Sequence, residues 1–172
     1  KIERYAFDGC TSLKSIIIPK SAKKIEEGTF KGCTSLESVT IPKGVKKING
    51  RAFFGCTSLK SITIPESVTE IGTGVFWCCS SLESIVVAEG NPIFDSRESC
   101  NAIVETETNA LLFGCKSTII PNSVKVIEGS AFLGFSLLKN ITIPKGVTKI
   151  CESVFKKWTS LVTVTLPVEV NK

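Results

Sequence analysis

Apolar residues recur along this chain at a fixed interval. Counting from a recurring proline, Val or Ala stands at plus three, Ile at plus six, Phe at plus eleven and Leu at plus seventeen. The prolines form two series with a spacing of 23 residues, Pro19, Pro42 and Pro65, and Pro121, Pro144 and Pro167. The phenylalanines are Phe30, Phe53, Phe76, Phe132 and Phe155. Such a period predicts a repeat array in which each repeat forms one coil.

The end of each repeat has the pattern of a short strand. In Leu36-Glu37-Ser38-Val39-Thr40-Ile41, alternate residues would face one side. A single coil cannot bury its apolar positions alone, so we expect the coils to stack and their strands to pair in parallel at about 4.8 Å. The proline that follows lacks an N–H donor and ends the strand. The predicted strands lie near residues 16–18, 39–41, 62–64, 85–87, 118–120, 141–143 and 164–166.

The other half of each repeat, Ile-x-x-x-Ala-Phe-x-Gly-Cys, predicts a single helical or 3₁₀ turn that ends at glycine. We therefore expect the fold class to be an α/β repeat solenoid that forms a single domain over residues 1–172. Its repeats are 1–18 (partial), 19–41, 42–64, 65–87, 88–120, 121–143, 144–166 and 167–172 (terminal partial).

Repeat 88–120 is longer than the others, with 33 residues. Its extra stretch has two β-rich runs, 100–104 and 110–115, on either side of a short polar loop. Two such runs around a loop predict a β-hairpin, which we expect to protrude from the solenoid.

A hairpin centred on that loop pairs residues whose numbers sum to 215. The opposed pairs would be Ala102 and Phe113, Val104 and Leu111, and Cys100 and Cys115. Directly opposed residues have β-carbons close enough for a disulfide bond. The pattern leaves two arrangements open for the cysteines, a disulfide or two half-buried thiols.

The unit Ile-Pro-x-x-Val-x-x-Ile-x-x-x-Ala-Phe-x-Gly-Cys-x-Ser-Leu-x-Ser-Ile-x-Ile-Pro resembles the BspA-type bacterial leucine-rich repeats. The resemblance covers essentially the whole chain, and the long repeat resembles the inserted hairpin of that family. It implies a leucine-rich-repeat right-handed coil with one short parallel strand per repeat and a protruding β-hairpin in one repeat. Family members are typically cell-surface or secreted bacterial proteins, with relatives in some parasitic protists, and are associated with adhesion. The resemblance therefore implies an extracellular or cell-surface location.

Four cysteines occupy one repeat position, namely Cys10, Cys33, Cys56 and Cys79. The next copies of that position are Phe135 and Trp158. A position that accepts Cys, Phe or Trp is filled as apolar volume, so we expect buried, unreactive thiols. The chain has no His and no Cys-x-x-Cys pair, so we expect neither a metal site nor a cofactor.

Composition argues against several functional classes. Without His, the usual base of a Ser or Cys nucleophile is absent, and no Gly-rich phosphate loop follows a strand, so we expect no enzymatic activity. The apolar runs are only a few residues long, too short for insertion into a membrane. The net charge of +5 is short of the clustered basic face of a nucleic-acid binder.

Lysines that follow the strands form a basic rim, broken by Glu66 and Glu70. Such a rim either steers an acidic partner or is a solvated edge that keeps the array soluble. The lysines are Lys20, Lys23, Lys24, Lys43, Lys46, Lys47, Lys145 and Lys149.

We expect a non-catalytic protein-binding or adhesion module that is a monomer and binds a protein ligand, such as a host-surface or matrix protein. The alternatives are a structural spacer that presents another domain, or an accessory region of an enzyme whose catalytic domain lies outside this sequence. Stacked coils create an extended surface, and loops tend to carry function, so we expect binding on the strand face and the hairpin. The candidate partner-binding residues are Thr40, Thr63, Thr142, Glu105, Glu107 and Asn109.

Overall fold

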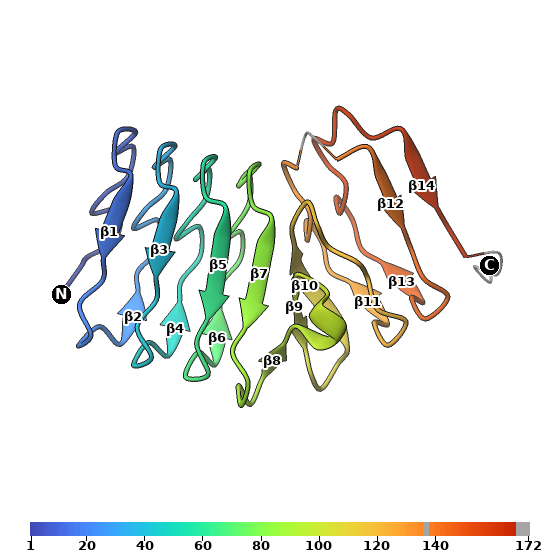
Figure 1. Cartoon of the computed structure of the whole chain (residues 1–172), viewed down its shortest axis with the longest axis horizontal. Helices are drawn as coiled ribbons and strands as arrows, with labels where there is room; N and C mark the ends of the chain where they lie inside the picture. The colour runs from blue at the N-terminus through green and yellow to red at the C-terminus, as the bar shows by residue number, and fades with distance from the viewer. Residues whose placement is uncertain (136–137, 168–172) are drawn as a thin grey trace.

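A computed structural model describes residues 1–135 and 138–167 of the chain, which winds into coils stacked side by side along one axis (Figure 1). Residues 168–172 of the terminal partial repeat lie outside the described residues. A front row of strands pairs in parallel as β1 with β3, β5 with β7, and β12 with β14. These strands are β1 (Ser15–Ile17), β3 (Ser38–Thr40), β5 (Ser61–Ile64), β7 (Ser84–Val87), β12 (Asn140–Thr142) and β14 (Thr163–Thr165).

The front row confirms six of the seven predicted strands, to within one residue at most ends. The seventh prediction was wrong, because residues 118–120 form no strand. Consequently the described residues contain no paired strand that links β7 to β12 directly.

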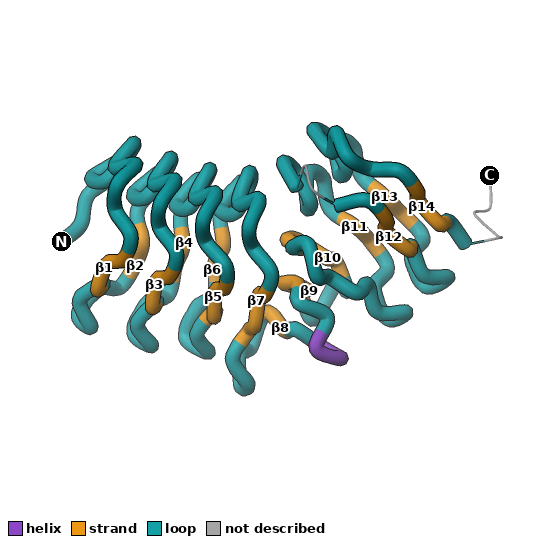
Figure 2. Tube along the Cα trace, turned by 45° about the horizontal axis from the view of Figure 1, so that its top comes forward, coloured by secondary structure: helices purple, strands orange, loops and turns teal. Residues whose placement is uncertain are grey.

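A second row of very short strands lies behind the first and was not predicted (Figure 2). The three-stranded parallel part is β2 (Lys24–Ile25), β4 (Lys47–Ile48) and β6 (Glu70–Ile71). Two further strands, β11 (Val126–Ile127) and β13 (Lys149–Ile150), pair in parallel with each other in the C-terminal half. Each coil with strands in both rows is therefore held on two sides.

The Phe-containing half of each coil is a series of hydrogen-bonded turns rather than a helix. The residues that the structure describes hold one helix, the 3₁₀ helix η1 (Arg97–Ser99), so the α/β label was wrong and the fold is a β-solenoid. The reason is that backbone N–H groups of the turns donate to carbonyls of the neighbouring coil. The N–H of Gly32 donates to the carbonyl of Phe54 at 2.7 Å, and that of Gly55 to Trp77 at 2.8 Å, both in the next coil. An α-helix would need those donors within its own turn.

The phenylalanine rings form a ladder through the core. Phe7, Phe30, Phe53 and Phe76 stack with centroids 5.5, 5.4 and 5.8 Å apart and interplanar angles of at most 13°. Phe30 and Phe53 are completely buried. Offset stacking at such distances adds to the free energy gained from burying the ring surface.

The hairpin of the long repeat is part of the body of the solenoid. It consists of β9 (Ala102–Glu105) and β10 (Ala110–Gly114), and β8 (Phe94–Asp95) pairs with β9 in antiparallel fashion. β10 pairs in parallel with β11, so the five-stranded sheet runs in the order β13-β11-β10-β9-β8. The expected protrusion was therefore wrong, because β10 takes the place of a second-row strand and its side chains fill the core.

The predicted hairpin register is correct at one end only. Val104 faces Leu111 as expected, but an irregularity between Leu111 and Phe113 places Phe113 opposite Ile103 instead of Ala102. A β-bulge of this kind adds a residue to one strand and re-aims the side chains beyond it.

The long coil also lacks the Phe turn of the regular coils. The N–H of Cys78 donates at 3.0 Å to Leu133, 55 residues on, where regular coils bond 22 residues on. The difference equals the 33 residues of the long repeat, so the turns before and after it stack directly on each other. Phe113 meets Phe76 edge-on, with centroids 5.7 Å apart. A β-carbon at Gly114 would lie 2.0 Å from the Phe132 ring, so this close approach requires glycine.

We predict that Phe53→Ala lowers the free energy of unfolding by about 3–5 kcal/mol, because it leaves a cavity between two stacked rings. Urea denaturation followed by fluorescence measures the loss. Phe155→Ala is the matched control, since Phe155 is only half-buried and should cost clearly less. Equal losses for the two variants would contradict the ladder as a source of stability.

We predict that Leu111→Ala costs about 2–5 kcal/mol, because Leu111 is fully buried between β9 and β11. The exposed Glu107 at the hairpin turn provides the control, and Glu107→Ala should change stability by less than about 0.5 kcal/mol. Thermal and urea unfolding distinguish this arrangement from a protruding hairpin, for which both substitutions would be nearly neutral.

Candidate partner-binding surface

The outward side chains of β1, β3, β5 and β7 form what we call the strand face. They include Ile17, Thr40, Thr63 and Val86, one from each coil, and the serines two residues before each of them. Ile17 is 92% exposed and Val86 44%, which is unusual for large aliphatic side chains, and both threonines are exposed. The strand face is thus a row of small or aliphatic side chains open to solvent.

Two adjoining grooves are hollowed into this face. The first has a volume of about 640 Å³ and the second about 440 Å³, and both contain Thr40, Ile41 and Lys43. The first groove is lined by Ile16, Ile17, Ile18, Lys20, Thr40, Ile41, Pro42, Lys43 and Gly44. The second is lined by Ser38, Val39, Thr40, Ile41, Lys43, Ser61, Thr63, Pro65, Glu66 and Ala88. Two of the candidate residues, Thr40 and Thr63, therefore lie together in one continuous depression.

Four lysines of the predicted basic rim fall into two pairs with different surroundings. Lys24 and Lys47 belong to the second row of strands and are paired, Lys24 with Glu26 at 2.8 Å and Lys47 with Glu70 at 2.6 Å. Lys20 and Lys43 instead line the grooves. No carboxylate of the described residues lies within 4.0 Å of either amine, so both are available to a partner.

The other candidate residues lie away from the grooves. Thr142 is exposed on β12, beyond the long coil that interrupts the front row. Glu107 is exposed at the hairpin turn. Neither groove is lined by Thr142 or by a residue of the hairpin turn, and a binding surface that combines the strand face with the hairpin stays a prediction.

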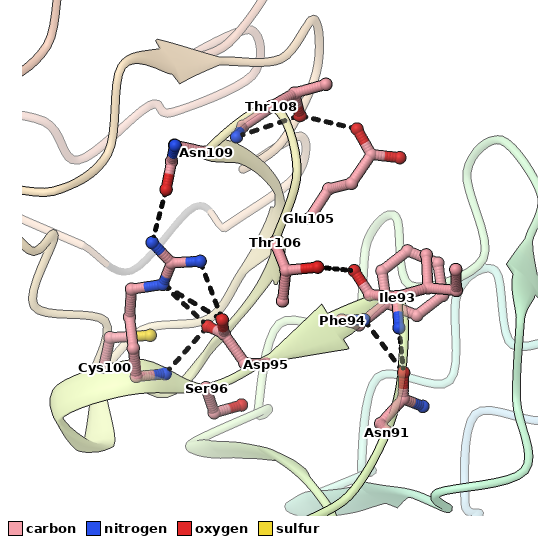
Figure 3. A network of polar contacts seen from close by, with 12 residues as sticks. Asn91, Ile93, Phe94, Asp95, Ser96, Cys100, Glu105, Thr106, Thr108 and Asn109 are labelled. Carbon is pink, nitrogen blue, oxygen red and sulfur yellow. Dashed lines mark hydrogen bonds and ion pairs between the residues drawn. The ribbon is translucent and has the colours of Figure 1, made fainter.

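Glu105 and Asn109 serve the hairpin itself (Figure 3). The hydroxyl of Thr108 donates to Glu105, and a guanidinium N–H of Arg97 donates to the side-chain oxygen of Asn109. Arg97 is held in turn by Asp95, with Nε to Oδ1 at 2.8 Å and Nη2 to Oδ2 at 2.7 Å. These side chains fix the turn against the segment before β9, which leaves them less free to contact a partner.

Asn91 joins the long coil to its neighbour, a role that sequence reasoning missed. Its amide nitrogen donates to the carbonyls of Pro65 at 3.0 Å and Val68 at 2.8 Å. Its amide oxygen accepts from the N–H groups of Ile93 and Phe94, as Figure 3 shows. An Asn directly before Pro92 is the available sequence signal, because Asn commonly caps such turns with its own side chain.

Cys100 and Cys115 are both free thiols in the structure, and both are buried rather than half-buried. The register shift in the hairpin removes the direct opposition that a disulfide would need. The thiol of Cys115 donates instead to the carbonyls of Glu83 and Asn101, each at 3.2 Å. The structure thus places both cysteines in the core, more deeply buried than expected and out of direct opposition.

The cysteine ladder is buried at Cys33, Cys56 and Cys79, as predicted, whereas Cys10 in the first coil is exposed. Each buried thiol donates at 3.1 Å to the carbonyl of the phenylalanine 26 residues earlier, so the site is more than apolar volume. Trp158 holds the same position, and its indole N–H donates to the carbonyl of Phe132, also 26 residues earlier. A side-chain donor, either a thiol or an indole N–H, thus links successive coils through this position.

The described residues contain no group of three or more His, Cys, Asp or Glu side chains arranged to hold a metal ion. Within the same part of the chain, no helix has the length and apolar character needed to cross a membrane.

The stacked coils, the ring ladder and the parallel front row define a leucine-rich-repeat solenoid. A family model described as the BspA type leucine-rich repeat region matches residues 1–106 and 102–172 with six copies, so the chain belongs to that family. No curated protein matches the sequence.

Several solved structures share the fold. A leucine-rich cell-surface protein from Faecalibacterium prausnitzii is 30% identical with a TM-score of 0.77, covering 92% of this chain and 49% of that protein. A leucine-rich repeat protein of Treponema pallidum is 29% identical with a TM-score of 0.56, covering 95% and 61%. The pneumococcal vaccine antigen PcpA, at 24% identity with a TM-score of 0.78 over 96% and 42%, shows the fold alone. The chain thus spans between about two fifths and three fifths of these proteins.

We predict that the buried ladder resists alkylation in the native state. Burial raises the pKa of the Cys33 thiol to about 11 and that of Cys56 to about 12. At pH 8 a thiol with a pKa of about 11 is ionised in only about one molecule in a thousand, and the thiolate is the reactive form. Iodoacetamide labelling followed by peptide mass spectrometry should modify exposed Cys10 first.

Cys33, Cys56 and Cys79 should react only after the chain is unfolded in urea, which supplies the control that every peptide can be detected. Rapid native labelling of Cys56, at the rate of Cys10, would contradict the burial of the ladder.

Proposed function

We propose that this chain is a non-catalytic protein-binding module of a cell-surface or secreted protein and that it acts in adhesion. The observation that carries the proposal is the pair of adjoining grooves on the strand face, which hold exposed Ile17 and the candidate residues Thr40 and Thr63. Membership of the BspA-type family supports a protein-interaction module, and the likeness to the F. prausnitzii cell-surface protein supports the location. The ligand would be a protein, such as a host-surface or matrix protein.

A spacer is the rival function, and the two make different demands on the surface. A spacer needs a polar and uniform exterior, whereas a binding face shows an apolar patch or hollow. The first groove has four isoleucines in its lining, one of them almost completely exposed. That feature favours binding over a spacer for the N-terminal half of the array. We propose that the module acts as a monomer and contributes neither nucleic-acid binding nor membrane insertion.

We predict that Thr40→Arg and Thr63→Arg each weaken binding at least tenfold, because a long charged side chain would fill the groove where small threonines now lie. The measurement is interferometry of the immobilised chain against a panel of purified extracellular-matrix and cell-surface proteins. Both positions are exposed, so the melting temperature should stay within about 2 °C of the parent.

Thr165→Arg is the matched control, since Thr165 is an exposed threonine of the front row on β14, outside both grooves. It should bind like the parent chain. If no protein of the panel binds, or if all three variants bind equally, the strand face is not a binding surface and the spacer takes its place.

A further inference from the structure

The residue after each coil's proline changes charge along the rim of the strand face. The first two coils have Lys20 and Lys43 at this position, and the next has Glu66. Ala88 replaces the proline of the fourth coil, lines the second groove and is followed by Glu89. All four charged side chains are exposed. The rim is therefore basic beside the first groove and becomes acidic along the second, which is lined by both Lys43 and Glu66.

None of these four charges is neutralised within the part of the chain that the structure describes. The ion pairs of that part involve other side chains, including Lys24 with Glu26 and Lys47 with Glu70 on the second row. Lys24 and Lys47, a few residues further along the same loops, are thus matched to carboxylates, while the four rim charges face solvent beside an apolar hollow. Charges arranged in this way provide orientation and specificity to an interface more than raw affinity.

We propose that the two grooves bind an extended peptide segment that has carboxylates at one end and cationic side chains at the other, with small or aliphatic residues between. This inference rests on the proposed function, since it takes the strand face as the binding surface. The carboxylates lie over Lys20 and Lys43, and the cations lie over Glu66 and Glu89. The middle of the segment covers Thr40 and Thr63, with an aliphatic side chain against Ile17.

The spacing of the coils sets the length of the segment. Neighbouring coils are separated by about 4.8 Å, so the centres of the basic and acidic parts of the rim lie about 10 Å apart. An extended chain advances about 3.3 Å per residue, which places the two charged ends about three residues apart. A segment running along the solenoid axis therefore spans both parts of the rim, whereas a single charged side chain reaches only one of them.

The test uses four fluorescein-labelled ten-residue peptides that share a Ser, Thr and Val centre. Their ends are acidic and basic, all acidic, all basic, or neutral, and fluorescence anisotropy gives each affinity for the whole chain. The acidic-and-basic peptide should bind at least tenfold more tightly than the other three, and high salt should reduce this preference. Equal binding of all four peptides overturns the proposal.

Two pairs of substitutions then assign the charges. Lys20→Glu with Lys43→Glu should weaken the acidic-and-basic peptide at least tenfold, while Lys145→Glu with Lys149→Glu, the same change of net charge on exposed lysines of a distant coil, should not. Glu66→Lys with Glu89→Lys should make the all-acidic peptide the best ligand. The same loss in the distant-coil control would reduce the effect to net charge and overturn the proposal.

The outcomes separate this inference from the proposed function. If Thr40→Arg abolishes binding of a matrix or surface protein but the peptides show no preference, the strand face binds a folded surface and only the inference fails. If neither the substitution nor the peptides have an effect, the proposed function fails as well.

Discussion

The hydrogen bond that each turn donates to the following coil is the interaction on which this solenoid depends. The N–H of Phe30 reaches the carbonyl of Ala52 at 2.9 Å, and that of Phe53 reaches Val75 at 3.0 Å, so the donor that would continue a helix is used between coils. The same bonds bring the rings to stacking distance and the thiol of Cys56 to within 3.1 Å of the Phe30 carbonyl. The same hydrogen bonds thus determine the local conformation, the core packing and the spacing of the repeats. A single coil cannot pair all of its backbone N–H and C=O groups without a neighbouring coil.

At the long coil, this hydrogen bond between turns has a different acceptor. The N–H of Cys78 donates to Leu133, which belongs to the coil after the long one. The long coil therefore contributes no turn to the stack of phenylalanine-containing turns, and it contributes the strands β9 and β10 instead. The hairpin strands are buried, since Ile103, Val104 and Leu111 have no exposed surface. Among the described residues, the front row has no strand in the long coil after β7, and this leaves the strand face, with its grooves, to the four coils on the N-terminal side.

Features that follow directly from the 23-residue period could be predicted from the sequence, whereas features without a periodic signal were missed. Front-row strands and the phenylalanine ladder follow from apolar residues in phase, and both are present. Second-row strands such as Lys47–Ile48 have two residues, too few for any alternation to be recognised. The hairpin was placed outside the body, although the unbroken apolar run Ala102-Ile103-Val104 is typical of a strand covered on both faces. Grooves depend on side-chain shape and backbone path together, so spacing predicted Thr40 as outward-facing but gave no sign of the hollow around it.

Repetition creates a recognition problem for any partner of such an array, because identical coils offer identical contacts at every register. Core positions cannot resolve it, since Phe, Ile and Leu recur to maintain the stacking. The buried hairpin offers only its turn, and Glu105 and Asn109 there already hold internal bonds. What differs from coil to coil on the strand face is confined to positions that the core does not need: an isoleucine at 17 where the next coils have threonine, and a lysine at 43 where the next coil has a glutamate. A partner that binds in one register must recognise these differences. Specificity therefore depends on the variable positions of the strand face and its rim, whereas the repeated core positions determine only the geometry of the surface.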